Sequence, residues 1–232
     1  MAERLSYIIP QIQTQNRIFI IADIQGCYDT LKLLIEGQLK LQKEDYIIFL
    51  GNLINKGKDS KKVLDYIIKL KRQFPNIHCV KGNHEQKLLL AFGCGFEFFE
   101  KYLADYNSED LLDGDIYEYI DLCASMELCI QVNDYLLSHL GFNAFVRTPA
   151  TDTRALFSDF DIHLDEHPMF QVHGHDSSSV AQILANINQQ TTVLSIDAGC
   201  VYTEDEDLGY LCCLELNSQE LFVQKNIEVL EA

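Results

Sequence analysis

A Gly-Asn-His-Glu tetrapeptide, Gly82 to Glu85, sets three chemically versatile side chains next to one another. The apolar run before it, 76–80, is typical of a short buried strand, and the run after it, 86–91, is typical of the start of a helix. Such a junction puts an amide, an imidazole and a carboxylate at the carboxyl end of a sheet, where open α/β sheets carry their chemistry. The tetrapeptide alone is equally typical of a plain turn whose Asn83 caps a helix.

Four further turns carry polar side chains of the same kinds, and each follows an apolar run that is typical of a strand. The turns are Asp23-Ile24-Gln25-Gly26, Gly51-Asn52-Leu53-Ile54-Asn55-Lys56-Gly57, Ser138-His139-Leu140-Gly141 and His173-Gly174-His175. Because polar turns at strand ends gather at one edge of an α/β sheet, we expect all five to meet in a single pocket.

The first half of the chain alternates between strand and helix patterns. Apolar runs over 17–24, 45–50 and 76–80 predict strands, and amphipathic patterns over 29–39 and 59–74 predict the helices between them. This alternation implies parallel βαβ units. Residues 88–126 look mostly helical.

That helical stretch holds an aromatic cluster, Phe92, Phe96, Phe98, Phe99, Tyr102 and Tyr106. We expect the cluster to be core, with a partner-binding surface as the alternative.

The second half predicts strands with tight turns and one helix, near 178–188. The pattern predicts a hairpin of two strands, 128–132 and 135–139, joined by a turn at Asn133-Asp134. Further strands are predicted over 169–173, 192–196, 209–216 and 220–224. We expect this half to pair mostly antiparallel.

The composition limits the classes of function. The chain has 232 residues, 47% of them hydrophobic, and a formal net charge of −17. No basic patch offsets this charge, so we expect no nucleic-acid partner. No apolar stretch approaches the roughly 20 residues of a membrane span, and the first residues lack the pattern of a secretory signal. The eight cysteines form no C-x-x-C pair, so we expect a cytoplasmic protein with free thiols.

The five turns, taken in this order, resemble the phosphoprotein phosphatases of the calcineurin-like metallophosphoesterase superfamily. The family pattern runs D-x-H-G, G-D-x-x-D-R-G, G-N-H-E, H-x-G and then G-H. The resemblance extends to about Tyr202, since the segment 196–202 is similar to a D-x-G-x-V-Y stretch of bacterial members, including diadenosine tetraphosphate hydrolases. It implies an α/β fold, a four-layer α/β/β/α metallophosphoesterase sandwich with mixed sheets, and we expect one domain over residues 1–232.

The resemblance also implies roles for single positions. In active members two divalent metals are bound, and a hydroxide between them attacks phosphorus. The metal-ligand positions correspond here to Asp23, Gln25, Asn52, Asn83, His139 and His175. The positions that assist the leaving group or hold phosphate correspond to His84, Asn55, Lys56 and Arg154.

Four of these positions depart from the family pattern. Gln25 stands where the pattern has a first-metal imidazole, and Asn52 stands where it has the carboxylate that bridges the metals. Asn55 replaces the carboxylate partner of His84, and Lys56 replaces an arginine. An amide is a weaker metal ligand than a carboxylate or an imidazole, and lysine lacks the bidentate fork of arginine.

Two functions follow from this mixture of kept and lost residues. The first is a pseudophosphatase that has kept the fold for binding, with a phosphate-bearing ligand or a phosphoprotein as partner. The second is an active metal-dependent phosphoesterase that hydrolyses a phosphoprotein or a nucleotide polyphosphate at a depleted site. We expect zero or one divalent transition metal ion (Mn, Fe or Zn) instead of two.

Overall fold

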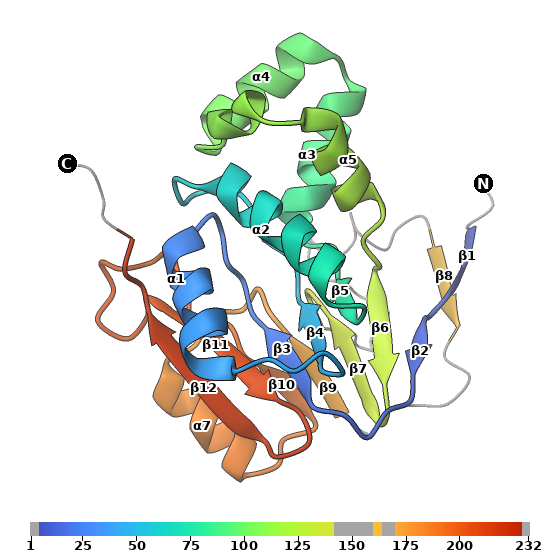
Figure 1. Ribbon diagram of the computed structural model, residues 1–232, viewed down its shortest axis with the longest axis vertical. Coiled ribbons are helices and arrows are strands. Elements are labelled where there is room, and N and C mark those ends of the chain that lie inside the picture. Colours follow the sequence, from blue (N-terminus) through green and yellow to red (C-terminus); the bar gives the residue numbers. More distant parts are fainter. Residues whose placement is uncertain (1–4, 142–159, 164–169, 229–232) are drawn as a thin grey trace.

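The computed structural model describes residues 5–141, 160–163 and 170–228. One mixed sheet of five strands lies at its centre (Figure 1). In spatial order its strands are β12 (Glu220–Lys225), β11 (Tyr210–Glu215), β3 (Ile18–Ile21), β4 (Tyr46–Phe49) and β5 (Ile77–Cys79). Strands β3, β4 and β5 are parallel, as the βαβ pattern predicted, and β11 is antiparallel to both of its neighbours.

A second five-stranded sheet comes mostly from the second half of the chain. Its strands, in spatial order, are β10 (Val193–Ser195), β9 (Phe170–His173), β7 (Tyr135–Ser138), β6 (Cys129–Val132) and β2 (Gln11–Ile12). The predicted β6–β7 hairpin is present. The expectation of mostly antiparallel pairing is wrong for this sheet, because β9 is parallel to both β7 and β10. Crossover connections, one of them containing α7 (Val180–Asn188), make parallel pairing possible.

Three short strands were not predicted from the sequence. They are β2 and the two strands of a separate parallel pair, β1 (Leu5–Ile8) and β8 (Phe160–His163). These strands lack the longer apolar runs and flanking turn residues that marked the predicted strands, and their partners lie more than 100 residues away.

The helices form two groups. In the first half of the chain they are α1 (Tyr28–Lys32), which continues as the π-helix η1 (Leu33–Leu39), α2 (Ser60–Gln73), α3 (Asn83–Gly93), α4 (Phe96–Asp105), the 3₁₀ helix η2 (Glu109–Asp113) and α5 (Ile116–Ala124). In Figure 1, α1 and α2 lie over the first sheet, and α3, α4 and α5 continue beyond its upper end. Helix α7 lies beside β10 instead. None of the described helices is long and apolar enough to cross a membrane.

Two buried clusters separate the layers. Phe19 and Ile21 of β3 pack in one cluster with residues of α1 and α2. Their neighbours Ile18 and Ile20 point the other way and pack with residues of the second sheet and with Ile183 of α7. Since side chains alternate between the faces of a strand, the first sheet is covered by helices on one face and by the second sheet on the other. This arrangement confirms the predicted four-layer α/β/β/α fold.

The aromatic cluster of the helical stretch is divided between core and surface. Phe99 and Tyr102 are buried, as expected. The prediction is wrong for Phe96 and Phe98, which are 65% and 64% exposed. Within the same turn of α4, Phe99 faces the core and Phe96 and Phe98 face outward, so spacing alone overstated their burial.

Candidate functional site

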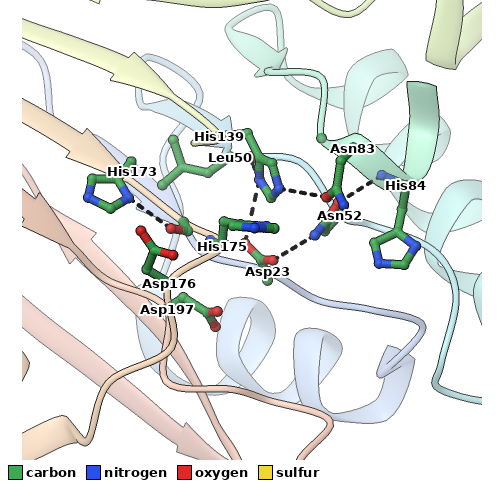
Figure 2. A network of polar contacts seen from close by, with 12 residues as sticks. Asp23, Leu50, Asn52, Asn83, His84, His139, His173, His175, Asp176 and Asp197 are labelled. Atoms are coloured by element: carbon green, nitrogen blue, oxygen red, sulfur yellow. Dashed lines mark hydrogen bonds and ion pairs between the residues drawn. The ribbon is translucent and has the colours of Figure 1, made fainter. Parts of the chain in front are cut away.

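The five polar turns meet at one end of the two sheets, as the sequence predicted (Figure 2). Asp23 follows β3, Asn52 follows β4, and Asn83 begins α3 just after β5. His139 follows β7, and His175 follows β9. Hydrogen bonds connect these turns to one another, so residues up to 152 positions apart share one pocket.

Much of the unusual backbone of the chain is gathered in these turns. Among the described residues, ten that are not glycine have a positive φ, and five of them belong to the five turns. These five are Gln25 (50°), Asn52 (49°), Asn55 (76°), Lys56 (63°) and His175 (63°). Left-handed backbone is costly for such residues and is concentrated at functional sites in many proteins.

Glycines let the turns touch backbone to backbone. A Cβ on Gly26 would lie 2.9 Å from the carbonyl carbon of Gly57. A Cβ on Gly51 would lie 2.7 Å from the Cα of Gly82, and one on Gly82 would collide with Asn52. The buried carboxylate of Glu85 strengthens this junction by accepting backbone N–H groups from Asn52, Leu53 and Gly82 at 2.8–2.9 Å. The turns are therefore held by backbone contacts rather than by the side chains that line the pocket.

Both polar atoms of the Asn52 side chain form hydrogen bonds within the protein. Its Nδ2 donates to Asp23 Oδ2 at 2.9 Å, and its Oδ1 accepts the backbone N–H of His84 at 3.1 Å. The other oxygen of Asp23 accepts the backbone N–H of His175 at 3.1 Å. An N–H group thus faces Asp23 from the position where the family pattern has a second carboxylate, and it satisfies the buried Asp23 without help from a cation.

His139 and Asn83 form the other half of the pocket. His139 Nδ1 lies 2.9 Å from the carbonyl oxygen of Leu50, which can only accept, so Nδ1 carries the hydrogen. The lone pair of Nε2 then faces Asn83 Oδ1 at 3.0 Å. Two acceptors at this distance are the arrangement that a shared cation stabilises, and a backbone carbonyl behind the imidazole is the usual support for a metal-binding histidine. The N-cap of α3 is Gly82 and Asn83 is the first residue of the helix, so Asn83 is not the capping residue that the plain-turn interpretation requires.

His175 lies against His139, with ring centroids 5.1 Å apart and the rings nearly perpendicular. Gln25 is buried, and its Oε1 has no hydrogen-bond partner within the described part of the chain. Arg154 lies outside the described residues. Of the ten residues that the resemblance singled out, the structure therefore describes nine.

Burial sets the protonation of the two carboxylates. It raises the pKa of Asp23 well above its usual range, and the negative charge of Asp197 raises it further. Burial likewise raises the pKa of Asp197. A bound cation would reverse both shifts, because it stabilises the ionised form.

The imidazoles shift in the opposite direction. Burial, with His175 adding to it, lowers the pKa of His139 well below its ordinary value. Burial and the positive charges of Lys56 and Lys87 lower the pKa of His84 to about 3. Both rings are therefore neutral at pH 7, which suits metal ligation but not proton donation.

Three contributors were missed by the sequence analysis. Asp197 is buried beside Asp23, held by Ser177 Oγ at 2.7 Å and by the backbone N–H of Gly199 at 2.8 Å. Its Asp-x-Gly motif, present in the sequence, was the available signal. The hydroxyl of Tyr202, which accepts a hydrogen bond from Lys56 Nζ, ends the same D-x-G-x-V-Y stretch, whereas the carbonyl of Leu50 had no comparable signal. Lys56 also lies over the Tyr202 ring, 4.7 Å from its centroid.

A separate group of carboxylates lies at the start of α1 and α2. Asp29, Asp59 and Glu228 form the one trio of histidine, cysteine, aspartate and glutamate side chains, among the described residues, whose ligand atoms lie within 4.8 Å of one another. Lys62 Nζ contacts Asp59 Oδ1 at 2.7 Å, and the backbone N–H of Thr30 donates to Glu228 at 3.0 Å. The ammonium group and the backbone N–H group offset part of this negative charge, but one oxygen of Asp59 and one of Glu228 are buried without a hydrogen-bond partner among the described residues.

Comparison with known proteins identifies the family. The family model for calcineurin-like phosphoesterases matches residues 16–208. The chain belongs to the calcineurin-like phosphoesterase family. A symmetrical bis(5'-nucleosyl)-tetraphosphatase of Buchnera aphidicola subsp. Acyrthosiphon pisum (strain 5A) is 32% identical over 127 residues, which cover 54% of this chain and 44% of the relative.

The protein of the same name from Wigglesworthia glossinidia brevipalpis is 45% identical over 74 residues, which cover 32% of this chain and 26% of the relative. The matched stretches thus span less than half the length of these curated relatives. Among solved structures, a protein assigned as a diadenosine tetraphosphatase superposes with a TM-score of 0.64 at 18% identity, covering 93% of this chain and 97% of its own. A serine/threonine phosphatase from Saccharomyces cerevisiae superposes with a TM-score of 0.62 at 13% identity, covering 96% and 85%. At these identities the likeness concerns the fold.

Membership of this calcineurin-like family implies the use of divalent metal. The Asn83 side of the pocket fits one such ion, since Asn83 Oδ1 and His139 Nε2 converge there and His175 lies beside them. The Asp23 side fits a metal ion poorly, because the Asn52 side chain donates an N–H group to Asp23 and its oxygen already accepts the backbone N–H of His84. Asp23 and Gln25 remain as ligands on that side, fewer than the three protein ligands on the Asn83 side, which water can complete.

Proposed function

We propose that this family member is a phosphate-binding protein with a depleted metal centre, a pseudophosphatase that binds a phosphate-bearing ligand or phosphoprotein and hydrolyses it weakly or not at all. The observation that carries the proposal is the engagement of Asn52 by Asp23 and His84. A residue whose oxygen is already hydrogen-bonded and whose nitrogen points at the neighbouring carboxylate is unsuited to bridge two cations. The centre then holds at most one ion, on the Asn83 side.

The remaining groups support binding. A cation held by Asn83, His139 and His175 would supply positive charge for phosphate oxygens. Lys56 adds an ammonium group at the same pocket, where it lies against Tyr202. These groups offset part of the chain's net charge of −17, which otherwise opposes an anionic ligand. We include no nucleic acid among the proposed partners.

A second candidate is an active metal-dependent phosphoesterase acting on a nucleotide polyphosphate or a phosphoprotein. It is favoured by the names of the relatives, which are symmetrical bis(5'-nucleosyl)-tetraphosphatases. Asp23, Asn83, His84, His139 and His175 all lie in the pocket, so the candidate has a structural basis. The two candidates differ in the number of metal ions and in turnover.

Metal content and turnover, measured on the same purified protein, test both candidates. Mn, Fe and Zn are counted by elemental analysis after equilibration with excess manganese. Hydrolysis of 4-nitrophenyl phosphate and of diadenosine tetraphosphate is then followed, with His139→Ala as the inactive control. We expect at most one equivalent of metal and no turnover above this control. Two equivalents with sustained turnover that His139→Ala abolishes would refute the binding proposal and establish the second candidate.

A triple variant, Gln25→His, Asn52→Asp and Asn55→Asp, provides the matched positive control. It restores the residue types of the family pattern at three positions, and we expect it to raise both the metal count and the turnover. No gain in either quantity would contradict the view that these three residues alone limit the site.

The location in the cell belongs to the same proposal. All eight cysteines are free thiols, and seven of them are buried. Unpaired thiols at this frequency support a reducing compartment such as the cytoplasm.

A further inference from the structure

Asn55 is the centre of a buried hydrogen-bond network behind the pocket. Its side-chain nitrogen lies 2.7 Å from His84 Nδ1 and 2.6 Å from the hydroxyl of Tyr102. Its side-chain oxygen accepts from Ser108 Oγ at 2.8 Å, and its backbone N–H donates to Ser60 Oγ at 2.9 Å. All five residues are buried, Asn55 completely, so no solvent competes for these hydrogens.

Two groups of fixed polarity determine every hydrogen in the network. The carbonyl oxygen of His84 can only accept, so the single hydroxyl hydrogen of Tyr102 goes to it, at 3.0 Å. The Tyr102 oxygen must therefore accept from Asn55, and the group of Asn55 that faces it is the NH₂. At the other end, the backbone N–H of Asn55 makes Ser60 Oγ an acceptor. Ser60 then donates to Ser108, and Ser108 donates to the Asn55 oxygen, in agreement with the same orientation.

The orientation of the amide determines the tautomer of His84. One hydrogen of the Asn55 NH₂ serves Tyr102, and the other points at His84 Nδ1. Nδ1 must then be the acceptor nitrogen of a neutral imidazole, and the ring hydrogen lies on Nε2. No hydrogen bond to Nε2 is found among the described residues, and His84 is 5% exposed. An N–H group is thus available to a ligand.

We propose that Asn55 and Tyr102 are positioning residues that hold His84 as the Nε2–H tautomer, so that His84 donates a hydrogen bond to a phosphate oxygen of the bound ligand and supplies no proton to a leaving group. The tautomer follows from the network alone. The role of the N–H group as a donor to phosphate rests on the proposed function.

A carboxylate at position 55 would give the opposite tautomer. It would accept from Nδ1–H of His84, which leaves a lone pair on Nε2, and it would stabilise the imidazolium in which Nε2 carries a second, transferable proton. It would also compete with the His84 carbonyl for the hydrogen of Tyr102, because both are acceptors. The NH₂ group of Asn55 therefore matches the acceptor that Tyr102 presents. Asn55 removes a charge and also fixes the hydrogen-bond directions of the network.

The tautomer is measured on the wild-type protein labelled with ¹⁵N-histidine, in two-bond ¹H–¹⁵N spectra at pH 7 without ligand. We expect the His84 signals of an Nε2–H ring. In Asn55→Asp we expect the hydrogen on Nδ1. In Tyr102→Phe combined with Ser108→Ala we expect a mixture of tautomers, because neither the Tyr102 hydroxyl nor the Ser108 hydroxyl then orients the Asn55 amide. Tyr117→Phe, which removes a hydroxyl from a 70% exposed ring, is the matched control and should leave the spectrum unchanged. An Nδ1–H ring in the wild type would overturn the inference, whatever the protein binds.

Inorganic phosphate is the probe for the donor role, with affinities measured by calorimetry. His84→Phe keeps the ring shape and loses the N–H group, and we expect it to bind phosphate about ten- to a hundredfold more weakly than the wild type. Equal affinities in a folded His84→Phe would refute the donor role. Wild-type protein with the Nε2–H ring and no affinity for phosphate would refute the proposed function and the donor role together, and would leave the tautomer assignment standing.

Discussion

Restoring a carboxylate at position 52 should destabilise this protein unless metal is present. Asn52→Asp keeps the shape of the side chain and the acceptor for the His84 N–H group. It replaces the NH₂ that donates to Asp23 Oδ2 at 2.9 Å by a second acceptor. Both residues are 1% exposed, so water does not enter to separate the charges.

The size of the effect follows from the contact distance. Two unit charges 2.9 Å apart repel by about 6 kcal/mol at an effective dielectric constant of about 20. Keeping one carboxyl protonated at pH 7 instead of near pH 4 costs less, about 4 kcal/mol. The pair therefore takes up a proton. The protonation cost sets the upper limit of the difference from wild type, because burial already raises the pKa of Asp23 in the wild-type protein. In a chain of 232 residues, about 4 kcal/mol lowers the melting temperature by roughly 8–16 °C.

The pH dependence has a definite sign. The folded variant binds one more proton than the unfolded chain above about pH 4, so its stability falls as the pH rises. At pH 5 the cost of keeping one carboxyl protonated falls to about 1.4 kcal/mol. The difference in melting temperature from wild type should then be roughly a third of the difference at pH 7. Manganese should recover the lost stability at pH 7, because a cation offsets the repulsion.

Melting temperatures of wild type and variant, measured by scanning fluorimetry with chelator and with manganese at pH 5 and pH 7, give all four comparisons. Asn188→Asp, on an exposed residue at the end of α7, is the matched control and should change stability by less than about 0.5 kcal/mol. If Asn52→Asp melts with the wild type in chelator at pH 7, the repulsion between positions 52 and 23 is not real, and the argument for an amide-adapted site is refuted.

Three other outcomes are expected. A chelator should leave the melting temperature of the wild type within about 2 °C, since N–H groups of Asn52 and His175 satisfy both oxygens of Asp23; a fall of many degrees would show structural metal. His139→Ala should lower manganese affinity at least about tenfold in calorimetry, and unchanged uptake would place the ion elsewhere. Burial raises but hydrogen bonds from Ser218, Ile18 and Asn217 lower the pKa of Glu215, with a net decrease. Glu215→Gln should therefore cost about 1–3 kcal/mol at pH 7 in denaturant unfolding, and this cost should shrink as the pH falls from the usual glutamate pKa of about 4.3 through the lowered pKa of Glu215. The exposed Glu220→Gln should stay neutral, and a pH-independent difference would contradict the prediction.

The meeting of the five turns was predictable because glycines and polar residues mark each strand end in the sequence. Asp23, Asn83 and His139 are found together for this reason, and the parallel pairing of β3, β4 and β5 follows from their connecting helices. The pairing of β9 with β7 was not predictable, because periodicity shows that a strand exists but not which neighbour it takes.

Hydrogen-bond partners were the hardest feature to predict. The carbonyl of Leu50 orients His139 through the backbone, so the type of side chain at position 50 carries no signal. Tyr102 sits in an aromatic stripe and was correctly expected in the core, yet its hydroxyl, rather than its ring, determines how Asn55 and His84 are arranged. This role becomes visible only in the structure, where α4 brings Tyr102 next to Asn55 and His84.

The backbone contacts between Gly51 and Gly82, and between Gly26 and Gly57, give the pocket a shape that does not depend on the chemistry displayed in it. A lineage with such a frame can exchange ligands for amides one codon at a time without having to find a new fold. A hydrolase and a binding protein can then share one fold and differ by a few side chains. Substitutions can convert one into the other without a change in the backbone.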